Sequence, residues 1–170
     1  MKTIVIYQSS TGFTRQYAEW IAESLGCEAI DVKHAPEKSV GEAELVIFGG
    51  WIMGNMVSGL EKIRKWNPKN LVVFAVGATP GNIVDVESMQ KENHLEGIPF
   101  FYMEGGFRFE KLNFLVKGML KNLKKATAKK EEKTAQEQFM AEYLGTSFDH
   151  ADQKNIESLV MYVKERSSVE

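Results

Sequence analysis

Cysteine is almost absent from this chain, and the structures that cysteine builds are excluded with it. Cys27 is the single cysteine among 170 residues, so no internal disulfide can form. One cysteine also cannot hold a zinc knuckle or an iron–sulfur cluster. The three histidines, His34, His94 and His150, lie far apart and lack the spacing of metal ligands. We therefore expect a protein without a metal site.

Long apolar runs are also missing. No stretch approaches the roughly 18 residues that a membrane-spanning helix needs. The first ten residues, MKTIVIYQSS, lack the long apolar stretch and the small-residue cleavage site of a signal peptide. The apolar fraction of 44% and the charged fraction of 26% are typical of a soluble globular protein. We expect a single cytoplasmic domain over residues 1–170.

Several phosphate-binding and catalytic patterns are absent as well. The chain has neither G-x-x-x-x-G-K-[ST] nor a G-x-G-x-x-G after its first strand, which disfavours a P-loop nucleotidase and a dinucleotide site. Cys27 is not followed six residues later by Arg, as a thiol phosphatase would require, and Gly49 stands where a receiver domain would carry Asp. No His, Asp or Cys constellation indicates acid–base or nucleophilic catalysis. We expect no catalytic side chain and no nucleic-acid partner.

Strand-like and helical patterns alternate along the chain. Continuous apolar runs are typical of parallel strands that are buried on both faces. The alternation predicts a three-layer α/β fold whose five-stranded parallel sheet has the strand order 2-1-3-4-5. Ligands of such sheets bind at the carboxyl ends of the strands. The predicted strands are Thr3–Tyr7, Glu28–Val32, Leu45–Phe48, Leu71–Val76 and Ile98–Met103, and the predicted helices are Thr14–Leu25, Val57–Trp66, Asp85–His94 and about Asp152–Arg166.

Four hydroxyl side chains and one glycine lie between the first strand and the first helix. The free N–H groups and partial positive charge of a helix N-terminus favour an anion. One hydroxyl would suffice as an ordinary helix cap, so this loop is rich enough to indicate phosphate binding. Because the loop contains no Lys, binding would depend on neutral donors. The candidate residues are Ser9, Ser10, Thr11, Gly12, Phe13 and Thr14.

The stretch YQSSTGFT resembles the phosphate loop of the flavodoxins, whose pattern after the first strand is [ST]-x-T-G-x-T. Thr11, Gly12 and Thr14 match this pattern best. The resemblance covers about residues 1–104 and 146–166. It implies a flavodoxin-like fold in which the six residues of the loop surround the phosphate of one non-covalently bound FMN.

The resemblance also implies that two further loops hold the flavin ring. The loop after the third strand is apolar and rich in glycine, which suits the flat isoalloxazine system. Either Trp51 or Met53 could stack on the ring, and simple core packing of both is the alternative. For the loop after the fourth strand, which lacks an aromatic residue, contact with the ring and a plain turn remain equally open. The candidate residues are Gly50, Trp51, Ile52, Met53, Gly54 and Asn55 in the first loop and Gly77, Ala78, Thr79 and Gly81 in the second.

An insertion at about residues 104–145 separates this chain from a short flavodoxin. Residues 111–133 contain eight Lys and two Glu, a net charge of +6, which leaves −8 for the rest of the chain. A predicted helix carries an apolar stripe of Leu112, Leu115, Val116, Met119, Leu120 and Leu123, with Lys117, Lys121, Lys124 and Lys125 on its other side.

Two interpretations of this helix remain open. It packs on the domain with its lysines in water, or the lysines contact an acidic partner or the inner face of the membrane. Phe114 falls on the lysine side, where packing would not explain it, and favours the second interpretation. Ala126–Gln138 is polar, and is either an exposed helix or a mobile segment.

A second resemblance includes the insertion. The segments VIFGGWIMG and EGGFRFEKLNFLVKGMLK, followed by FDHADQ and a final helix, are similar to bacterial menaquinone-dependent protoporphyrinogen oxidases. This similarity implies an oxidoreductase that passes electrons through FMN to an acceptor such as a quinone. The Lys-rich segment Lys129–Lys133 departs from that family. The alternatives are a flavodoxin-type electron carrier between protein partners and a non-redox phosphate-binding module.

Overall fold

Five parallel strands form the centre of the protein in a computed structural model that describes residues 1–168. They pair in the order β2-β1-β3-β5-β6, which confirms the predicted order because β5 and β6 are the fourth and fifth of the predicted strands. The runs in β1, β3 and β5 are buried at almost every position, as expected of central strands covered on both faces. Their bounds are β1 Thr3–Gln8, β2 Glu28–Asp31, β3 Leu45–Met53, β5 Leu71–Gly77 and β6 Phe100–Glu104.

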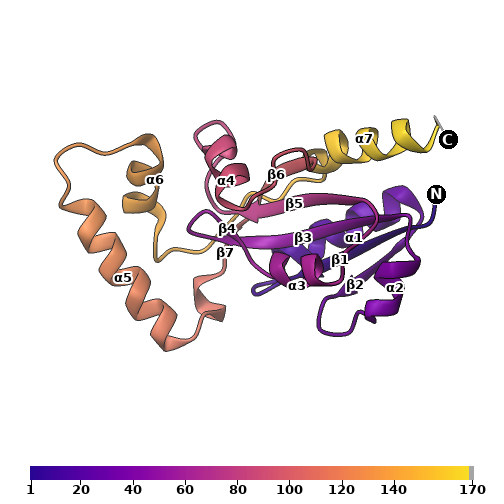
Figure 1. Ribbon diagram of the computed structural model, residues 1–170. Coiled ribbons are helices and arrows are strands. Elements are labelled where there is room, and N and C mark those ends of the chain that lie inside the picture. The colour runs from indigo at the N-terminus through magenta and orange to yellow at the C-terminus, as the bar shows by residue number, and fades with distance from the viewer. Residues whose placement is uncertain (169–170) are drawn as a thin grey trace.

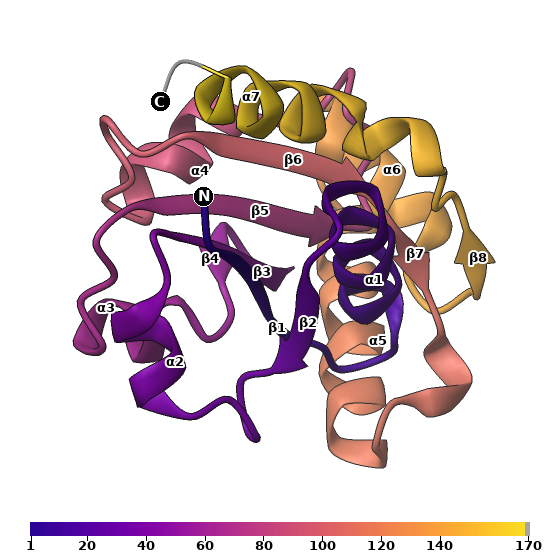
Figure 2. The same cartoon turned by 90° about the vertical axis from the view of Figure 1, so that its right-hand side faces the viewer.

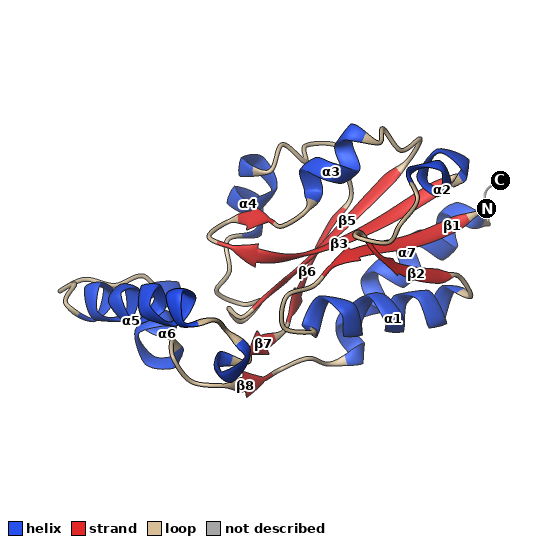
Figure 3. Ribbon diagram, turned by 90° about the horizontal axis from the view of Figure 1, so that it is seen from below, coloured by secondary structure: helices blue, strands red, loops and turns tan. Residues whose placement is uncertain are grey.

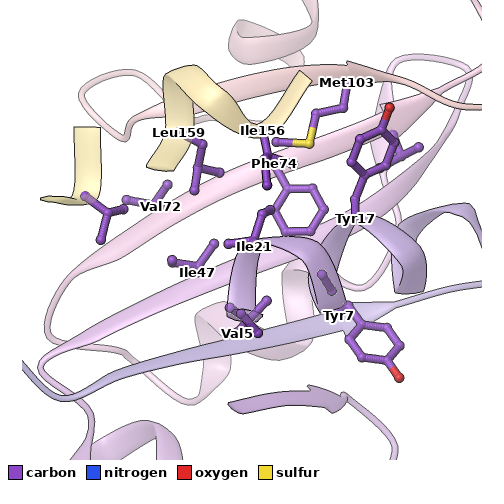
Figure 4. Close-up of a cluster of buried hydrophobic side chains, with 14 of the residues drawn as sticks. Val5, Tyr7, Tyr17, Ile21, Ile47, Val72, Phe74, Met103, Ile156 and Leu159 are labelled. Carbon is purple, nitrogen blue, oxygen red and sulfur yellow. The ribbon is translucent and has the colours of Figure 1, made fainter. Parts of the chain in front are cut away.

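Helices cover the sheet on both faces (Figure 3). On one face, Tyr17 and Ile21 of α1 and Leu159 of α7 pack against Phe74 in a first core (Figure 4). On the other face, Ile63 of α3 and residues of α2 and α4 form a second core. The sheet is therefore the middle of three layers. The helices are α1 Phe13–Leu25, α2 Glu37–Glu42, α3 Leu60–Lys65, α4 Val86–Glu92 and α7 Glu157–Ser167, the last preceded by the 3-10 turn η2 Gln153–Ile156.

The third strand differs from its prediction. It does not end at Gly49 but continues through Gly50 to Met53, and β4 (Met56–Val57) folds back on it as an antiparallel hairpin. The predicted start of a helix at Val57 is wrong for the same reason, since α3 begins at Leu60. Gly49 continues the strand because it lies opposite Phe74 of β5, whose ring occupies the space that a side chain would take.

We expect Gly49→Ala to reduce the free energy of unfolding by about 1–3 kcal/mol, because overpacking a core displaces well-fitted side chains. A Cβ at this position would lie 2.0 Å from Cζ of Phe74. Urea unfolding followed by circular dichroism measures the loss. Gly41→Ala is the matched control, because a Cβ on this helical glycine would meet no atom within 4 Å. Equal stability of the two variants would contradict the steric argument.

Residues 106–149, which we call the arm, leave the sheet after β6. The arm starts with β7 (Gly106–Phe107) and ends with β8 (Phe148–Asp149), and these two strands pair antiparallel with each other. Between them lie η1 (Phe109–Lys111), α5 (Phe114–Ala128) and α6 (Ala135–Tyr143). Figures 1 and 2 show α5 and α6 projecting beyond the carboxyl ends of β3 and β5.

Two features order the second half of the arm. Thr134 and Glu137 form a capping box at the start of α6. The Phe139 and Tyr143 rings stack at 4.6 Å between centroids, and both contact the Phe148 ring edge to face. The segment Ala126–Gln138, whose structure the sequence left open, therefore contains the end of α5, a connection and the start of α6. None of the helices in residues 1–168 is long and apolar enough to cross a bilayer.

Candidate functional site

The hydroxyl-rich loop joins the end of β1 to the start of α1. Gly12 is the N-cap residue of α1 and has a φ of 105°, a backbone conformation that favours glycine. Its N–H donates to Oγ of Ser9 over 3.1 Å. No side chain caps the helix, so the first-turn N–H groups are available to an anion.

This loop opens into a cavity of about 420 Å³, which is within the usual range for ligand sites. Four segments surround the cavity: the loop, the β3–β4 hairpin, the end of β5 and the arm. The loop contributes hydroxyl groups, whereas the hairpin and α5 contribute mostly apolar side chains. The lining residues are Ser10, Thr11, Phe13, Thr14, Trp51, Ile52, Met53, Gly54, Val76, Gly77, Ala78, Gly106, Phe107, Arg108, Leu112, Val116, Met119, Leu120, Leu123, Met140 and Leu144.

A second cavity of about 340 Å³ adjoins the first and lies beneath α6. The two cavities share wall residues from the hairpin, β5 and the arm, among them Ile52, Gly77 and Met140. The two cavities therefore lie side by side at the carboxyl ends of the strands. The second cavity is also lined by Asn55, Thr79, Val84, Met89, Tyr102, Gln136, Phe139, Tyr143 and Phe148.

The structure brings most of the candidate residues to these two cavities. Ten of them line the first cavity: Ser10, Thr11, Phe13, Thr14, Trp51, Ile52, Met53, Gly54, Gly77 and Ala78. Asn55 and Thr79 line the second. The remaining candidates, Ser9, Gly12, Gly50 and Gly81, line neither. Ser9 and Gly12 shape the loop from within, whereas Gly50 lies in β3 close to the backbone of Ser58.

The hairpin is held in place by Asn93, a residue that the sequence analysis did not single out. Asn93 is the C-cap residue of α4 and is 1% exposed. Its Oδ1 accepts from the N–H of Val57 at 2.8 Å, and its Nδ2 donates to the carbonyl of Asn55 at 2.6 Å and to that of Met89 at 2.8 Å. A satisfied buried amide of this kind fixes the turn that carries Gly54 and Asn55.

The loop after β5 is anchored by two residues of β6. Tyr102 Oη donates to the carbonyl of Thr79 at 2.6 Å, and a Glu104 carboxylate oxygen accepts from the N–H of Gly81 at 2.5 Å. Burial raises the pKa of Tyr102, so its phenol stays protonated and keeps donating. The backbone at Gly77 and Ala78 is thereby fixed as one wall of both cavities.

Arg108, at the start of the arm, is the main residue that the sequence analysis missed. Its Nη1 donates to the carbonyl of Thr11 at 2.7 Å, and its guanidinium lies over the Phe13 ring, with Cζ 4.2 Å from the ring centroid. The expectation that phosphate binding depends on neutral donors took no account of this residue, which places a cation against the loop. Its separation of 97 residues from Thr11 left no local sequence pattern that could have revealed it.

The sequence matches the family described as "Flavodoxin domain" over residues 4–134. Among solved structures, a flavodoxin from the domain Archaea is 21% identical, covering 61% of this chain and 78% of that one at a TM-score of 0.43. Oxidised flavodoxin 2 of Bacillus cereus is 19% identical (61% and 84%, TM-score 0.46). A flavoprotein from Lactobacillus acidophilus NCFM in complex with FMN is 13% identical (61% and 91%, TM-score 0.41). A comparison with curated proteins found no match.

Proposed function

The chain belongs to the flavodoxin domain family, and we propose that it binds one FMN in the 420 Å³ cavity and works as an FMN-dependent oxidoreductase. The observation that carries this proposal is the composition of the cavity wall. An uncapped helix start and hydroxyl groups at the loop suit a phosphate, and the apolar hairpin suits a flat ring. Both surfaces open into the same cavity.

The residues present fit FMN better than a dinucleotide, because the chain has a loop for one phosphate and no second glycine-rich turn. The hydroxyls of Thr11 and Thr14, with the N–H groups of the first turn of α1, would hold the phosphate. Trp51 and its neighbours in the hairpin, with the backbone of Gly77 and Ala78, would hold the ring. When bound, FMN supplies the redox chemistry, and the protein contributes binding, orientation and exclusion of water.

The arm favours an enzyme with a small electron acceptor over a carrier that docks with proteins. Val116 and Leu120 of α5 line the cavity from the side opposite the sheet. An arm in this position narrows the access of a folded partner to the cavity, while an apolar molecule could enter along the exposed side chains of Met53 and Met119. We therefore favour an oxidoreductase like the protoporphyrinogen oxidases, with a quinone as acceptor.

The first test of the proposed function is the colour and the cofactor of the purified protein. We expect a flavin absorption spectrum, and FMN as the main species when the cofactor is released by mild denaturation and identified by mass. Recovery of FAD, or a colourless protein that fails to bind added FMN, would contradict the proposal. Turnover with a menaquinone analogue as acceptor then separates the enzyme from the electron carrier.

We further propose that α5 contacts an anionic membrane surface. The four lysines of α5 differ in their exposure. Lys117 and Lys124 are partly buried, and their Nζ atoms donate to the carbonyls of Glu110 and Glu142, each at 3.2 Å. Lys121 and Lys125 are exposed.

Exposed apolar side chains accompany the two outward lysines. Phe114 is 80% exposed and Leu115 is 68% exposed. An exposed helix face that combines large apolar side chains with lysines is typical of a helix lying at a membrane surface. This combination supports a lipid surface over an acidic protein as the partner of α5.

A further inference from the structure

Arg108 connects three segments that are far apart in the sequence. Its Nη1 binds the backbone of the phosphate loop at Thr11, and its Nη2 lies 3.5 Å from a carboxylate oxygen of Asp149 in β8. The guanidinium also packs against Gly12, where a Cβ would lie 2.7 Å from Nη1. Arg108 therefore ties both ends of the arm to the loop at the start of α1.

The same side chain faces the cavity. Among the described residues that line the 420 Å³ cavity, Arg108 is the one with a formal charge, and it lines the cavity together with Ser10, Thr11 and Thr14. A guanidinium has more N–H donors than the contacts with Thr11 and Asp149 use. Its planar fork is suited to phosphate oxygens.

We propose that Arg108 binds the phosphate of FMN, so that this phosphate is held jointly by the loop and by the arm. The proposal rests on the proposed function, because it assumes that FMN occupies this cavity. A phosphate monoester carries a charge of about −1.5 to −2 at neutral pH. The loop supplies neutral hydroxyl and N–H donors. Arg108, whose Nη2 faces Asp149 at 3.5 Å, supplies the cationic donor among the described residues of the cavity wall.

A joint site also links cofactor binding to the placement of the arm. A ligand that contacts both elements favours the conformation in which they meet, and that conformation in turn favours the ligand. Arg108 is proposed to contact the phosphate and not the ring. The contribution of Arg108 to this coupling should therefore require the phosphate. FMN and riboflavin, which differ by the phosphate alone, are therefore the probes that isolate it.

The test is to titrate apoprotein with FMN and, separately, with riboflavin while following flavin fluorescence. We expect Arg108→Gln to weaken FMN binding about ten-fold, which corresponds to one charge-assisted hydrogen bond, and to change riboflavin binding less than two-fold. Arg108→Lys should fall between wild type and Arg108→Gln, because it keeps the charge but loses the fork.

Arg15→Gln is the matched control. Like Arg108→Gln, it removes one positive charge near the loop, because Arg15 lies in the first turn of α1. The Arg15 side chain, however, pairs with Glu19, with Nε 2.7 Å from the carboxylate. Its FMN affinity should therefore stay near that of wild type.

Limited trypsin digestion measures how firmly the arm is held in place. The cleavage sites are Lys129, Lys130 and Lys133 in the connection between α5 and α6. FMN should protect this connection more than riboflavin does, and in Arg108→Gln the two flavins should protect it equally.

The possible outcomes distinguish a failure of the proposed role of Arg108 from a failure of the proposed function. If wild type binds neither flavin, the proposed function fails. If wild type binds FMN, but Arg108→Gln leaves its affinity unchanged or weakens FMN and riboflavin equally, the role of Arg108 fails and the proposed function stands. Equal protection of the wild-type arm by the two flavins would overturn the coupling through the phosphate.

Discussion

Thr11→Ala is expected to weaken FMN binding by about ten- to a hundred-fold, because a hydrogen bond to a charged group is worth about 1.5–3 kcal/mol. Thr11 lines the cavity at the loop, and its own carbonyl is already occupied by Arg108. The Thr11 hydroxyl is a donor from which a phosphate oxygen can accept, and Thr11→Ala removes this donor while keeping the backbone N–H. Titration of the apoprotein with FMN, followed by flavin fluorescence, measures the change.

Riboflavin and Thr79→Ala are the two controls for this prediction. Riboflavin lacks the phosphate, so Thr11→Ala should change its affinity much less. Thr79 lines the second cavity, away from the phosphate loop, so Thr79→Ala should affect the two flavins alike. An equal loss of FMN and riboflavin affinity in Thr11→Ala would place Thr11 away from the phosphate.

Exchanging all four lysines of α5 for Gln is expected to reduce association with anionic vesicles by up to about a thousand-fold, since each basic residue at such a surface contributes about 1 kcal/mol. The FMN content should not change, because none of the four lines the cavity. Co-sedimentation with vesicles that contain phosphatidylserine measures the association. High salt should weaken wild-type binding, because exposed charges are screened over about 8–10 Å at physiological ionic strength.

The helix contains its own matched control. The pair Lys121→Gln and Lys125→Gln removes the same charge from α5 as the pair Lys117→Gln and Lys124→Gln. The first pair is exposed, whereas the second is partly buried. We expect the outward pair to cause most of the loss. If wild type does not bind vesicles at either salt concentration, the membrane proposal is wrong. If the two pairs act equally, the outward face is not the docking surface.

The central fold was predictable because its signals are local. Continuous apolar runs in the sequence predict β1, β3 and β5, and Gly26 ends α1 at the expected position. The hairpin was not predictable in this way. Two consecutive glycines normally interrupt a strand, whereas here the ring of Phe74 packs against Gly49, and both glycines pair with β1 and β5.

The residues of the candidate site differ in the same way: some have local sequence signals and others depend on contacts between distant segments. The phosphate loop could be found because its hydroxyl groups are consecutive and lie between a strand and a helix. Asn93 and Arg108 could not, because each acts on backbone far away in the sequence, at Val57 and at Thr11 respectively. Side chains that recognise backbone carbonyls and N–H groups leave no partner side chain that a sequence pattern could reveal.

The short ladder at the base of the arm has a consequence for how such a protein could evolve. Because Gly106 pairs with Asp149 and Phe107 with Phe148, the chain enters and leaves the arm at neighbouring positions. A tight turn could close this ladder with little added cost in loop entropy. The arm is thus a cassette that recombination can shorten, lengthen or exchange while the sheet persists. The loop of residues 9–14 lies outside the arm and would stay in such an exchange, whereas Arg108 would be inherited with the cassette.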